Sequence, residues 1–411
     1  MPDGQGAGTS GTNSDAGGDM RGDTATVPAG TVTAPAGERD GRSGGTTAGA
    51  GSGGCAAGTS TGTGTVRSPA DDDVVRRGTV VVETGPGAVQ VGVDPRWSVR
   101  ITGLLPAEVR WLRHSALRGA PGIRGDCPAE VRVAQLRGAL RAAGLLVAPV
   151  QTHPDAILAP ANGAADVAAL AQLADGTTGD AVLAARARRT VAIDGLGRSG
   201  MAIAVVLASA GVGRLVLDDP TVVQATDVGL GAYRWQDVGQ VRSTAARRVI
   251  SEVSGVHVSS RVEQDLDAAV LTSAWVADAA RADRLMVDRV PHLSVVTGEA
   301  GATVGPFVRP GSTPCLRCVE LARADEDPAW PVVSRALRSR SRLTATAEST
   351  ATATAAGIAA AQVLALLDGA EPTTGHACIE VLLPGCVPTG RPVAPWAGCA
   401  CGAARSTTPR S

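Results

Sequence analysis

Large apolar side chains are almost absent from the first 70 or so residues and become frequent from about residue 78 onward. Gly, Thr, Ser and Ala dominate the early stretch, which therefore buries too little apolar surface to offset the entropy lost on ordering. We expect a disordered tail over residues 1–75. A tail that binds a partner is the alternative, although the stretch has no repeat and no cluster of charge to support it.

Between residues 78 and 149 the pattern of apolar positions predicts a small α+β module. Short β-type runs broken by Gly and Pro predict strands at residues 79–83, 88–92 and 97–102. Two runs that each carry Pro in the first turn, where the missing amide is tolerated, predict helices at residues 106–117 and 128–143. A last apolar run at residues 145–147 could return as a strand, so a winged-helix-like arrangement is plausible.

The second half of the chain has a different pattern of apolar positions. Residues 150–180 are rich in Ala, Pro and Gly and are expected to be a linker with one helix at 164–173. From residue 181 to about 405, strands and helices alternate at first, which is typical of an α/β fold with a doubly wound parallel sheet. The apolar stretch at residues 344–367 carries Glu348 and many Thr. It suits a buried helix better than a membrane span, which needs about 20 predominantly apolar residues.

Composition and charge narrow the possible functions. All 38 basic residues are Arg, so mechanisms that need a lysine amine, such as a P-loop lysine or a Schiff base, are excluded. The net charge of −1 provides no general attraction for nucleic acid or acidic lipid, so we expect neither nucleic acid nor a membrane as partner. No apolar segment of signal-peptide type follows Met1, which favours a cytoplasmic protein.

A glycine motif, formed by Gly195, Gly197 and Gly200, lies between an apolar run at 190–193 and a helical segment. In this context the first glycine permits a tight turn, the second lets a phosphate approach the backbone, and the third lets the helix pack on the sheet. Asp219 ends the next predicted strand, where an acid can accept hydrogen bonds from ribose hydroxyls. Alternatively, the glycines serve only close packing and no nucleotide binds.

The stretch from Gly195 to Asp219 resembles the ThiF/MoeB/HesA family of ubiquitin-activating-like adenylyltransferases. The blocks that carry the resemblance are Ala-Gly-Val-Gly at 210–213, Leu-Val-Leu-Asp-Asp at 215–219, Asp-Val-Gly at 237–239, Gly-Pro at 305–306 and Pro-Cys-Leu-Arg-Cys at 314–318. The resemblance covers about residues 180–401. It implies a Rossmann-like nucleotidyltransferase fold, ATP bound at the glycine motif, a peptide or small protein as substrate, and a homodimer.

Four positions depart from the charged residues of that family. Arg242 stands where the family has Lys, and it remains a candidate phosphate contact with a different shape. The other three positions are uncharged here, namely Thr221, Leu230 and the segment around Trp275. Because loss of one charge-stabilising group commonly costs about 100-fold in rate, we expect adenylation to be weak or lost. A divergent but active site, or charges supplied by another segment, is the alternative.

Two close pairs of cysteines, Cys315 with Cys318 and Cys399 with Cys401, predict a zinc site. Eight Cys in 411 residues are too few for a disulfide scaffold, and close pairs in a reducing compartment indicate metal ligands. Four thiolates make a closed, structural site that does not activate water. A redox C-x-x-C is the alternative, but it leaves the second pair unexplained.

Other reactive side chains are weaker candidates. His292 follows Pro291 at the start of a predicted strand and could face the cleft or be a satisfied structural histidine. The remaining cysteines are expected to be buried small hydrophobes, namely Cys127, Cys378 and Cys386, with Cys55 in the tail.

The module at residues 78–149 resembles, through residues 89–95 and 104–108, the winged-helix domains that recognise leader peptides in peptide maturation. Azole-forming peptide cyclodehydratases pair such a module with a ThiF-like domain, and residues 309–318 and 327–331 look like that branch. There the ThiF fold often serves as a scaffold while a separate enzyme binds ATP. The resemblance implies that an extended peptide adds a strand to the module's sheet.

Two functions follow from the sequence. The first is an adenylyltransferase that holds ATP at the glycine motif and Asp219 and activates a peptide or small protein. The second is a catalytically degenerate peptide-binding scaffold that works with a separate ATP-dependent modifying enzyme. NAD-dependent redox chemistry is less supported, because it gives the cysteine pairs and the Ala-Gly-Val-Gly block no role.

Overall fold

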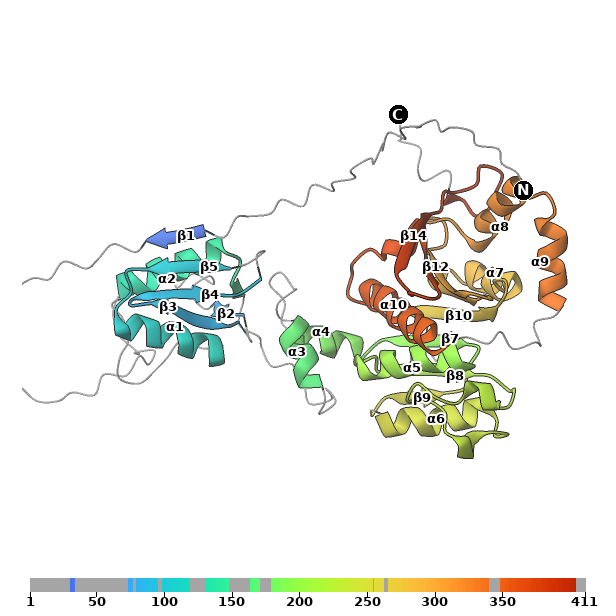
Figure 1. Cartoon of the computed structure of the whole chain (residues 1–411), viewed down its shortest axis with the longest axis horizontal. Helices are drawn as coiled ribbons and strands as arrows, with labels where there is room; N and C mark the ends of the chain where they lie inside the picture. The colour runs from blue at the N-terminus through green and yellow to red at the C-terminus, as the bar shows by residue number, and fades with distance from the viewer. Residues whose placement is uncertain are drawn as a thin grey trace, which may run out of the picture. The chain divides into compact units, whose positions relative to one another are not determined.

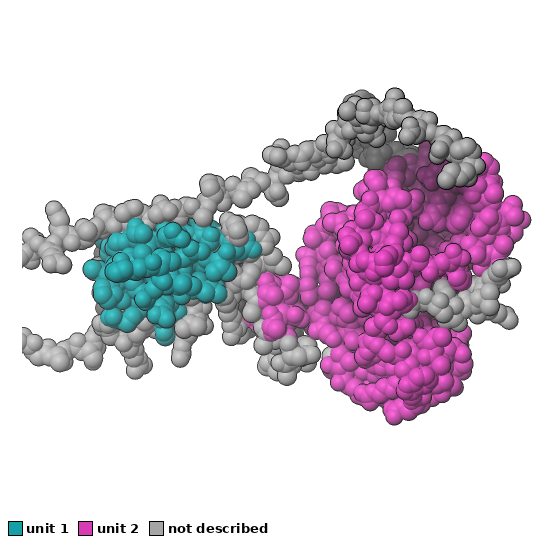
Figure 2. Space-filling model, in the orientation of Figure 1, with its two compact units in different colours: residues 1–58, 79–114, 121–145 teal, residues 59–78, 115–120, 146–411 magenta. Residues whose placement is uncertain are grey.

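The computed structural model describes residues 30–33, 73–76, 79–94, 98–118, 130–147, 163–170, 179–253, 255–261, 265–339 and 348–403. The chain divides into two compact units, which Figure 2 distinguishes by colour. The first unit comprises Met1–Gly58, Thr79–His114 and Pro121–Leu145, and the rest of the chain forms the second. Most of the expected tail and linker lies outside the described residues.

The first unit is built on a small antiparallel sheet, as the hydrophobic pattern predicted. Its strands are β3 (Val81–Gly85), β4 (Ala88–Val91) and β5 (Val99–Thr102), in the order β5-β4-β3. Gly87 in the β3–β4 turn has a φ of +66°, and a Cβ there would lie 2.7 Å from the carbonyl oxygen of Leu104. Only glycine meets both demands, which is why the hairpin turns at this point.

Two strands lie within residues 1–75, where the sequence predicted only disorder, namely β1 (Gly30–Thr33) and β2 (Val74–Val75). β1 (Gly30–Thr33) runs parallel to β5 on the side away from β4 (Figure 1). Its register places Gly30 opposite Val99 and Thr33 opposite Thr102. The run of Thr31 to Thr33 is β-branched and so favours a strand, but it is too short to show a period in a Gly-rich surrounding.

Two helices complete the first module, α1 (Pro106–Arg118) and α2 (Glu130–Ala142). Between sheet and helices lie buried Val89, Ile101, Trp111, Leu112, Leu136 and Leu140. The helices are also joined by a buried ion pair, because Arg132 Nε donates to Glu108 Oε1 at 2.7 Å. The hydrogen bond from Arg132 lowers the pKa of the Glu108 carboxyl despite its burial.

Short elements of the second unit precede its main sheet. They are the antiparallel strands β2 (Val74–Val75) and β6 (Leu146–Val147), and the helices α3 (Ala164–Leu170) and α4 (Gly179–Arg186). α3 begins where the sequence predicted a helix. Arg186 of α4 pairs with Asp368 at 2.6 Å, which ties this helix to the end of a later one.

The second unit contains an eight-stranded mixed sheet in the order β14-β13-β12-β11-β10-β7-β8-β9 (Figure 1). The strands are β7 (Thr190–Asp194), β8 (Arg214–Asp218), β9 (His257–Ser259), β10 (Ala268–Ala274), β11 (His292–Thr297), β12 (Gly301–Val308), β13 (Ala377–Leu382) and β14 (Pro388–Pro392). β7 to β11 are parallel, whereas β12 to β14 pair antiparallel. The expected parallel sheet is therefore one half of a mixed sheet. The order of the parallel strands reverses between β7 and β10, where open α/β sheets bind ligands.

Helices cover both faces of this sheet. Their bounds are α5 (Arg198–Ser209), α6 (Arg242–Val253), α7 (Ala279–Val287), α8 (Leu316–Glu326), α9 (Trp330–Ser339) and α10 (Ser349–Leu367). Val270 of β10 belongs to the largest core cluster, together with residues of α5, α6 and α10. The next residue, Leu271, packs instead with Ala282 of α7 and Leu316 of α8. Successive strand residues point to opposite faces, so α7 and α8 cover the other side.

α10 is the one described helix that is long and apolar enough, by length and composition, to cross a membrane. In the structure it packs on α5 and contributes Ala355, Ala359 and Val363 to the largest core cluster. Glu348 caps its N-terminus by accepting hydrogen bonds from the amides of Thr350 and Ala351. These contacts are those of the buried helix that the sequence predicted.

Candidate functional site

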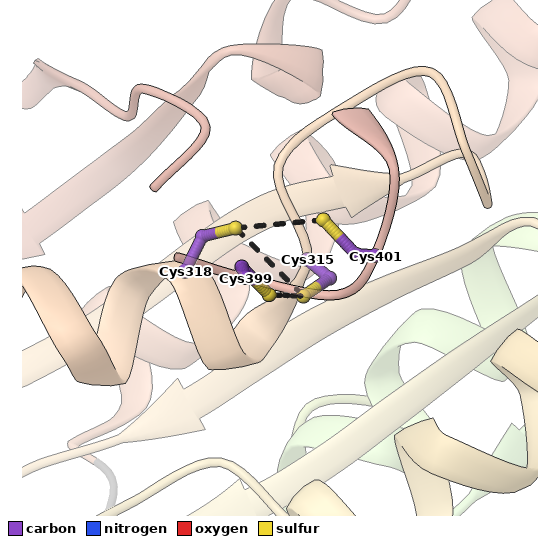
Figure 3. Close-up of side chains that lie close together, drawn as sticks. All are labelled: Cys315, Cys318, Cys399 and Cys401. Carbon is purple, nitrogen blue, oxygen red and sulfur yellow. Dashed lines mark hydrogen bonds between the residues drawn. The ribbon is translucent and has the colours of Figure 1, made fainter. Parts of the chain in front are cut away.

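Four cysteine sulfurs from two distant segments meet at one point (Figure 3). Cys315 caps the N-terminus of α8 and Cys318 lies in its first turn, whereas Cys399 and Cys401 come from the loop after β14. The sulfur–sulfur distances are 3.9 Å for Cys315–Cys318, 3.6 Å for Cys315–Cys399 and 3.7 Å for Cys318–Cys401. These are the four residues that the sequence predicted to share a metal.

The spacing of the sulfurs fits zinc and does not fit disulfides. A disulfide bond is about 2.05 Å long, whereas a tetrahedron with zinc–sulfur bonds of about 2.3 Å has edges of about 3.8 Å. Burial raises the pKa of the Cys315 and Cys318 thiols, whereas hydrogen bonds lower the pKa of Cys401 despite its burial. An all-sulfur donor set leaves no position for water. The cluster is therefore consistent with structural zinc, which would hold the C-terminal loop to α8.

The other cysteines described in the structure lie apart from this cluster. Cys378 is buried in β13, and burial raises the pKa of its thiol to about 11. Cys386 is only half-buried, with its sulfur 3.4 Å from Thr350 Oγ1. Cys378 is thus the small buried hydrophobe that was expected, and Cys386 is partly so. Cys55 and Cys127 lie outside the described residues.

His292 does not face the glycine motif. It begins β11 and is fully buried, at the end of the sheet opposite to the one where the loop after β7 lies. Its Nδ1 lies 2.9 Å from the carbonyl oxygen of Val290, and burial lowers the pKa of the imidazole. It lines a cavity of about 480 Å³ beside Met286 and Glu320. His292 therefore has no role at the nucleotide cleft, and it is not a fully satisfied structural histidine either, because its Nε2 is buried with no hydrogen-bond partner among the described residues.

The first and third glycines of the motif are required by packing. Gly195 has a φ of +86°, and a Cβ there would lie 2.5 Å from Thr272 Oγ1 on β10. A Cβ on Gly200 would lie 1.9 Å from the carbonyl oxygen of Gly195. Thr272 Oγ1 also donates to that carbonyl at 2.8 Å, which fixes the loop at the point where the strand order reverses. These two positions therefore need glycine whether or not a nucleotide binds.

Gly197 differs from its two neighbours. Its backbone is extended, and a Cβ there would meet only atoms at ordinary contact distance, Asp227 Oδ1 at 3.6 Å and Arg242 Nη2 at 3.7 Å. Packing therefore does not require glycine at this position. What lies against Gly197 is the guanidinium of Arg242, the residue that the sequence singled out as a phosphate contact.

Arg242 is fully engaged by acids of its own chain. Its Nε and Nη2 donate to Asp227 Oδ2 at 3.0 and 2.6 Å. Its Nη1 donates to Thr221 Oγ1 at 3.0 Å and to Asp219 Oδ2 at 3.3 Å. Burial alone would lower the pKa of Arg242, but Asp227 and Asp219 raise it. All three guanidinium nitrogens are thus used within the chain, and two buried carboxylates outnumber one positive charge.

Asp219 also serves the loop rather than an external ligand. Its Oδ2 accepts the amide of Leu196 at 2.8 Å, and its Oδ1 accepts the amide and the hydroxyl of Thr221 at 3.0 and 2.6 Å. Burial alone would raise the pKa of Asp219, but these hydrogen bonds and the charge of Arg242 lower it. The carboxylate is ionised and already bonded between the glycine motif and the segment after β8.

Two residues of this cluster escaped the sequence analysis. Asp227 lies three residues before Leu230, and its pairing with Arg242 becomes visible only in three dimensions. Tyr233, the only Tyr of the chain, is buried, and its hydroxyl donates to the carbonyl oxygen of Leu196 at 3.0 Å. A buried carboxylate beside Gly197 repels anions, so Asp227 disfavours a phosphate at the glycine motif.

The remaining positions include one more charged group in the loop, because Arg198 lies between Gly197 and Gly200. Trp275 follows β10 with a φ of +71°, and Asp278 caps α7 by accepting the amide of Arg281. Arg281 pairs with Asp194 at 2.9 Å. Arg198, the first residue of α5, donates to Ser349 Oγ at 2.7 Å. Arg242 thus lies over Gly197 between two carboxylates, whereas Arg198 lies within the motif and donates to a neutral hydroxyl.

Solved structures share this fold over both units. A structure of Escherichia coli MccB with AMPCPP and MccA matches with a TM-score of 0.58 at 15% identity, covering 80% of this chain and 99% of that one. The microcin C7 biosynthetic enzyme MccB with N-formylated MccA matches with a TM-score of 0.55 at 15% identity and the same coverage. PaaA matches with a TM-score of 0.58 at 18% identity, covering 77% and 98%. At these identities the similarity concerns the fold.

A comparison with curated proteins finds no match. The model of the ThiF family matches residues 171–381, which is more than half of the 411 residues. That range contains the glycine motif, Arg242 and the first cysteine pair. The chain belongs to the ThiF family.

Proposed function

We propose that this protein is a peptide-binding scaffold with a degenerate nucleotide pocket, which presents a peptide to a separate ATP-dependent modifying enzyme. The observation that carries the proposal is the pairing of Arg242 with Asp227 and Asp219. A triphosphate would have to replace Asp227 on the guanidinium and then lie beside its uncompensated carboxylate. Breaking a buried pair in this way commonly costs about 3–5 kcal/mol.

The first unit supports the peptide-binding part of the proposal. Its small sheet and two helices agree with the resemblance to winged-helix leader-peptide domains, and an extended peptide can add a strand to such a sheet. The solved MccB structures were determined with MccA, and they cover the first unit as well as the second. In this proposal the protein acts in the cytoplasm as a homodimer whose zinc is structural.

Peptide adenylation is the second candidate. The glycine motif and Asp219 are retained, and MccB of the same fold was solved with ATP. On this hypothesis Arg242 leaves Asp227 and contacts phosphate when ATP enters. The chemistry would still lack the acid that the family carries after β10, where this chain has Trp275.

ATP–pyrophosphate exchange separates the two candidates. The wild-type protein would be assayed with candidate peptides, such as the products of short open reading frames beside its gene. A Gly195→Ala variant is the control for a disrupted loop. The proposal predicts exchange at the level of that control. Robust exchange by the wild-type protein would overturn the scaffold proposal in favour of the adenylyltransferase.

A further inference from the structure

The two edges of β5 differ in how they are covered. β4 pairs with one edge and is joined to β5 by a short connection, whereas β1 pairs with the other edge from far away in the sequence. Residues 34–98 separate the two paired segments. A strand edge presents a row of amide and carbonyl groups that any extended chain can pair with. The structure thus contains an extended segment of the chain itself, bound at one outer edge of the β5-β4-β3 sheet.

We propose that Gly30–Thr33 is an internal occupant of the peptide-accepting edge of β5, which an incoming peptide must displace. The inference rests on the proposed function, because it assigns the peptide ligand to this edge. In this inference Gly30–Thr33 is a regulatory element. A peptide binds the edge of β5 only if it pairs with that edge more strongly than Gly30–Thr33 does.

The register shows that the occupied edge belongs to the core strand of the module. Val32 pairs in register with Ile101 and Gly30 with Val99, and both of these β5 residues are buried. Thr31 pairs in register with Arg100, whose side chain is exposed. The core contacts of β5 therefore do not depend on β1. When β1 leaves, β5 stays in place and its outer edge can pair with another extended chain.

β1 itself is suited to leaving. It has only four paired residues, and it begins with glycine, which loses the most backbone freedom on ordering. Pro28 and Pro35 flank it in the sequence and cannot donate an amide, so the pairing cannot extend far in either direction. A competing peptide with a longer run of pairing groups would gain more hydrogen bonds on the same edge.

Hydrogen exchange tests the occupancy directly in the full chain. Alternate residues of a parallel strand make the ladder bonds, so a double variant, Thr31→Pro with Val32→Pro, removes an amide whichever residue donates. The matched control is Thr46→Pro with Thr47→Pro in the same tail. We expect faster exchange of the amides of Val99–Thr102 in the first variant, with the control unchanged. Equal exchange in all three proteins would refute the strand.

Binding of a probe tests the competition. The probe is a fluorescein-labelled synthetic peptide with the sequence of residues 26–37, followed by anisotropy. A tethered occupant acts at a high effective concentration, so we expect the double variant to bind the probe at least about 10-fold more tightly than the wild-type protein. The Thr46/Thr47 control should bind like wild type. Equal affinity of wild type and double variant, or no binding by either, would overturn the proposal.

The outcome is independent of the test of the proposed function. The probe requires neither ATP nor a second enzyme, so positive ATP–pyrophosphate exchange would reject the scaffold and leave the internal strand standing. Conversely, failure of probe binding would remove the internal strand without supplying evidence of adenylation.

Discussion

The cysteine cluster and the Arg242 cluster use their bonding capacity in opposite ways. Three sulfur–sulfur distances among Cys315, Cys318, Cys399 and Cys401 are 3.6–3.9 Å, which is consistent with four thiolates around one zinc ion. Arg242, Asp219 and Asp227 instead carry opposite charges and satisfy one another within the chain. The presence of a family motif is therefore weaker evidence for ligand binding than the presence of charged groups that no residue of the chain already pairs with.

Removal of the metal site should have the largest effect. The double variant Cys315→Ser with Cys399→Ser should lose zinc and much of the stability of the second unit, because metal-binding free energy becomes folding free energy. Metal content of the purified protein and thermal unfolding measure the two effects. Cys386→Ser is the control and should keep its zinc. A double variant that is as stable as wild type without zinc would disprove the structural role.

Removal of the guanidinium should be the next largest effect. Arg242→Ala leaves Asp219 and Asp227 buried without a partner, and the expected cost is about 3–5 kcal/mol in the free energy of unfolding. Arg234→Ala is the matched control, because the exposed pair of Arg234 with Glu252 should contribute about 0–1 kcal/mol. Urea unfolding compares the two. Similar small losses would mean that the Arg242 pairs contribute little to the fold.

Substitutions at the glycines of the motif should differ in how much stability they cost. Gly200→Ala forces a Cβ to within 1.9 Å of the Gly195 carbonyl oxygen and should destabilise the protein by about 1–3 kcal/mol. Gly197→Ala meets only ordinary contacts and should cost less than about 1 kcal/mol. Thermal unfolding of both variants tests the division. An equal loss at the two positions would contradict the separate roles assigned to them.

Acid should produce the smallest effect. The folded-state pKa of Asp219 is lowered, so its ionised form stabilises the fold above the unfolded value of about 3.9, and this stabilisation is lost as the pH falls through the folded pKa. The gap in unfolding free energy between wild type and Asp219→Asn should therefore be widest near neutral pH and narrow below about pH 4. Urea titrations across this range measure it. A gap that stays constant with pH would exclude this linkage.

The sequence predicted one of these clusters better than the other for a physical reason. The close spacing of the cysteines within each pair is visible in the sequence. The structure was needed only to show that the two pairs lie together. Asp227 gives no such signal, because an acid is common in a surface loop and its meaning depends on Arg242 lying across from it. β1 escaped for a similar reason, since a strand of four residues is stabilised by its pairing with β5 and not by its own pattern.

The module and the sheet show the same limit. Short β-type runs broken by Gly and Pro predicted the small sheet, and runs with Pro in the first turn predicted its two helices. The alternation of strands and helices predicted the parallel, Rossmann-like part of the second unit. The antiparallel strands β12 to β14 were not foreseen, because strand direction is set by connections and pairing that composition does not record. The sequence placed His292 correctly at the start of a strand. Which end of the sheet that position occupies depends on the direction of the strand, and the sequence pattern does not give this direction.

Binding of Mg-ATP tests the central claim most directly, because it needs no peptide. Equilibrium dialysis with labelled ATP would compare the wild-type protein with Asp227→Asn, which keeps the shape of the side chain, removes one negative charge and leaves Asp219 as the one described carboxylate paired with Arg242. The account predicts no saturable binding by the wild-type protein up to about 1 mM, the upper end of common KM values, and measurable binding by Asp227→Asn. Saturable micromolar binding by the wild-type protein, unchanged in Asp227→Asn, would contradict it.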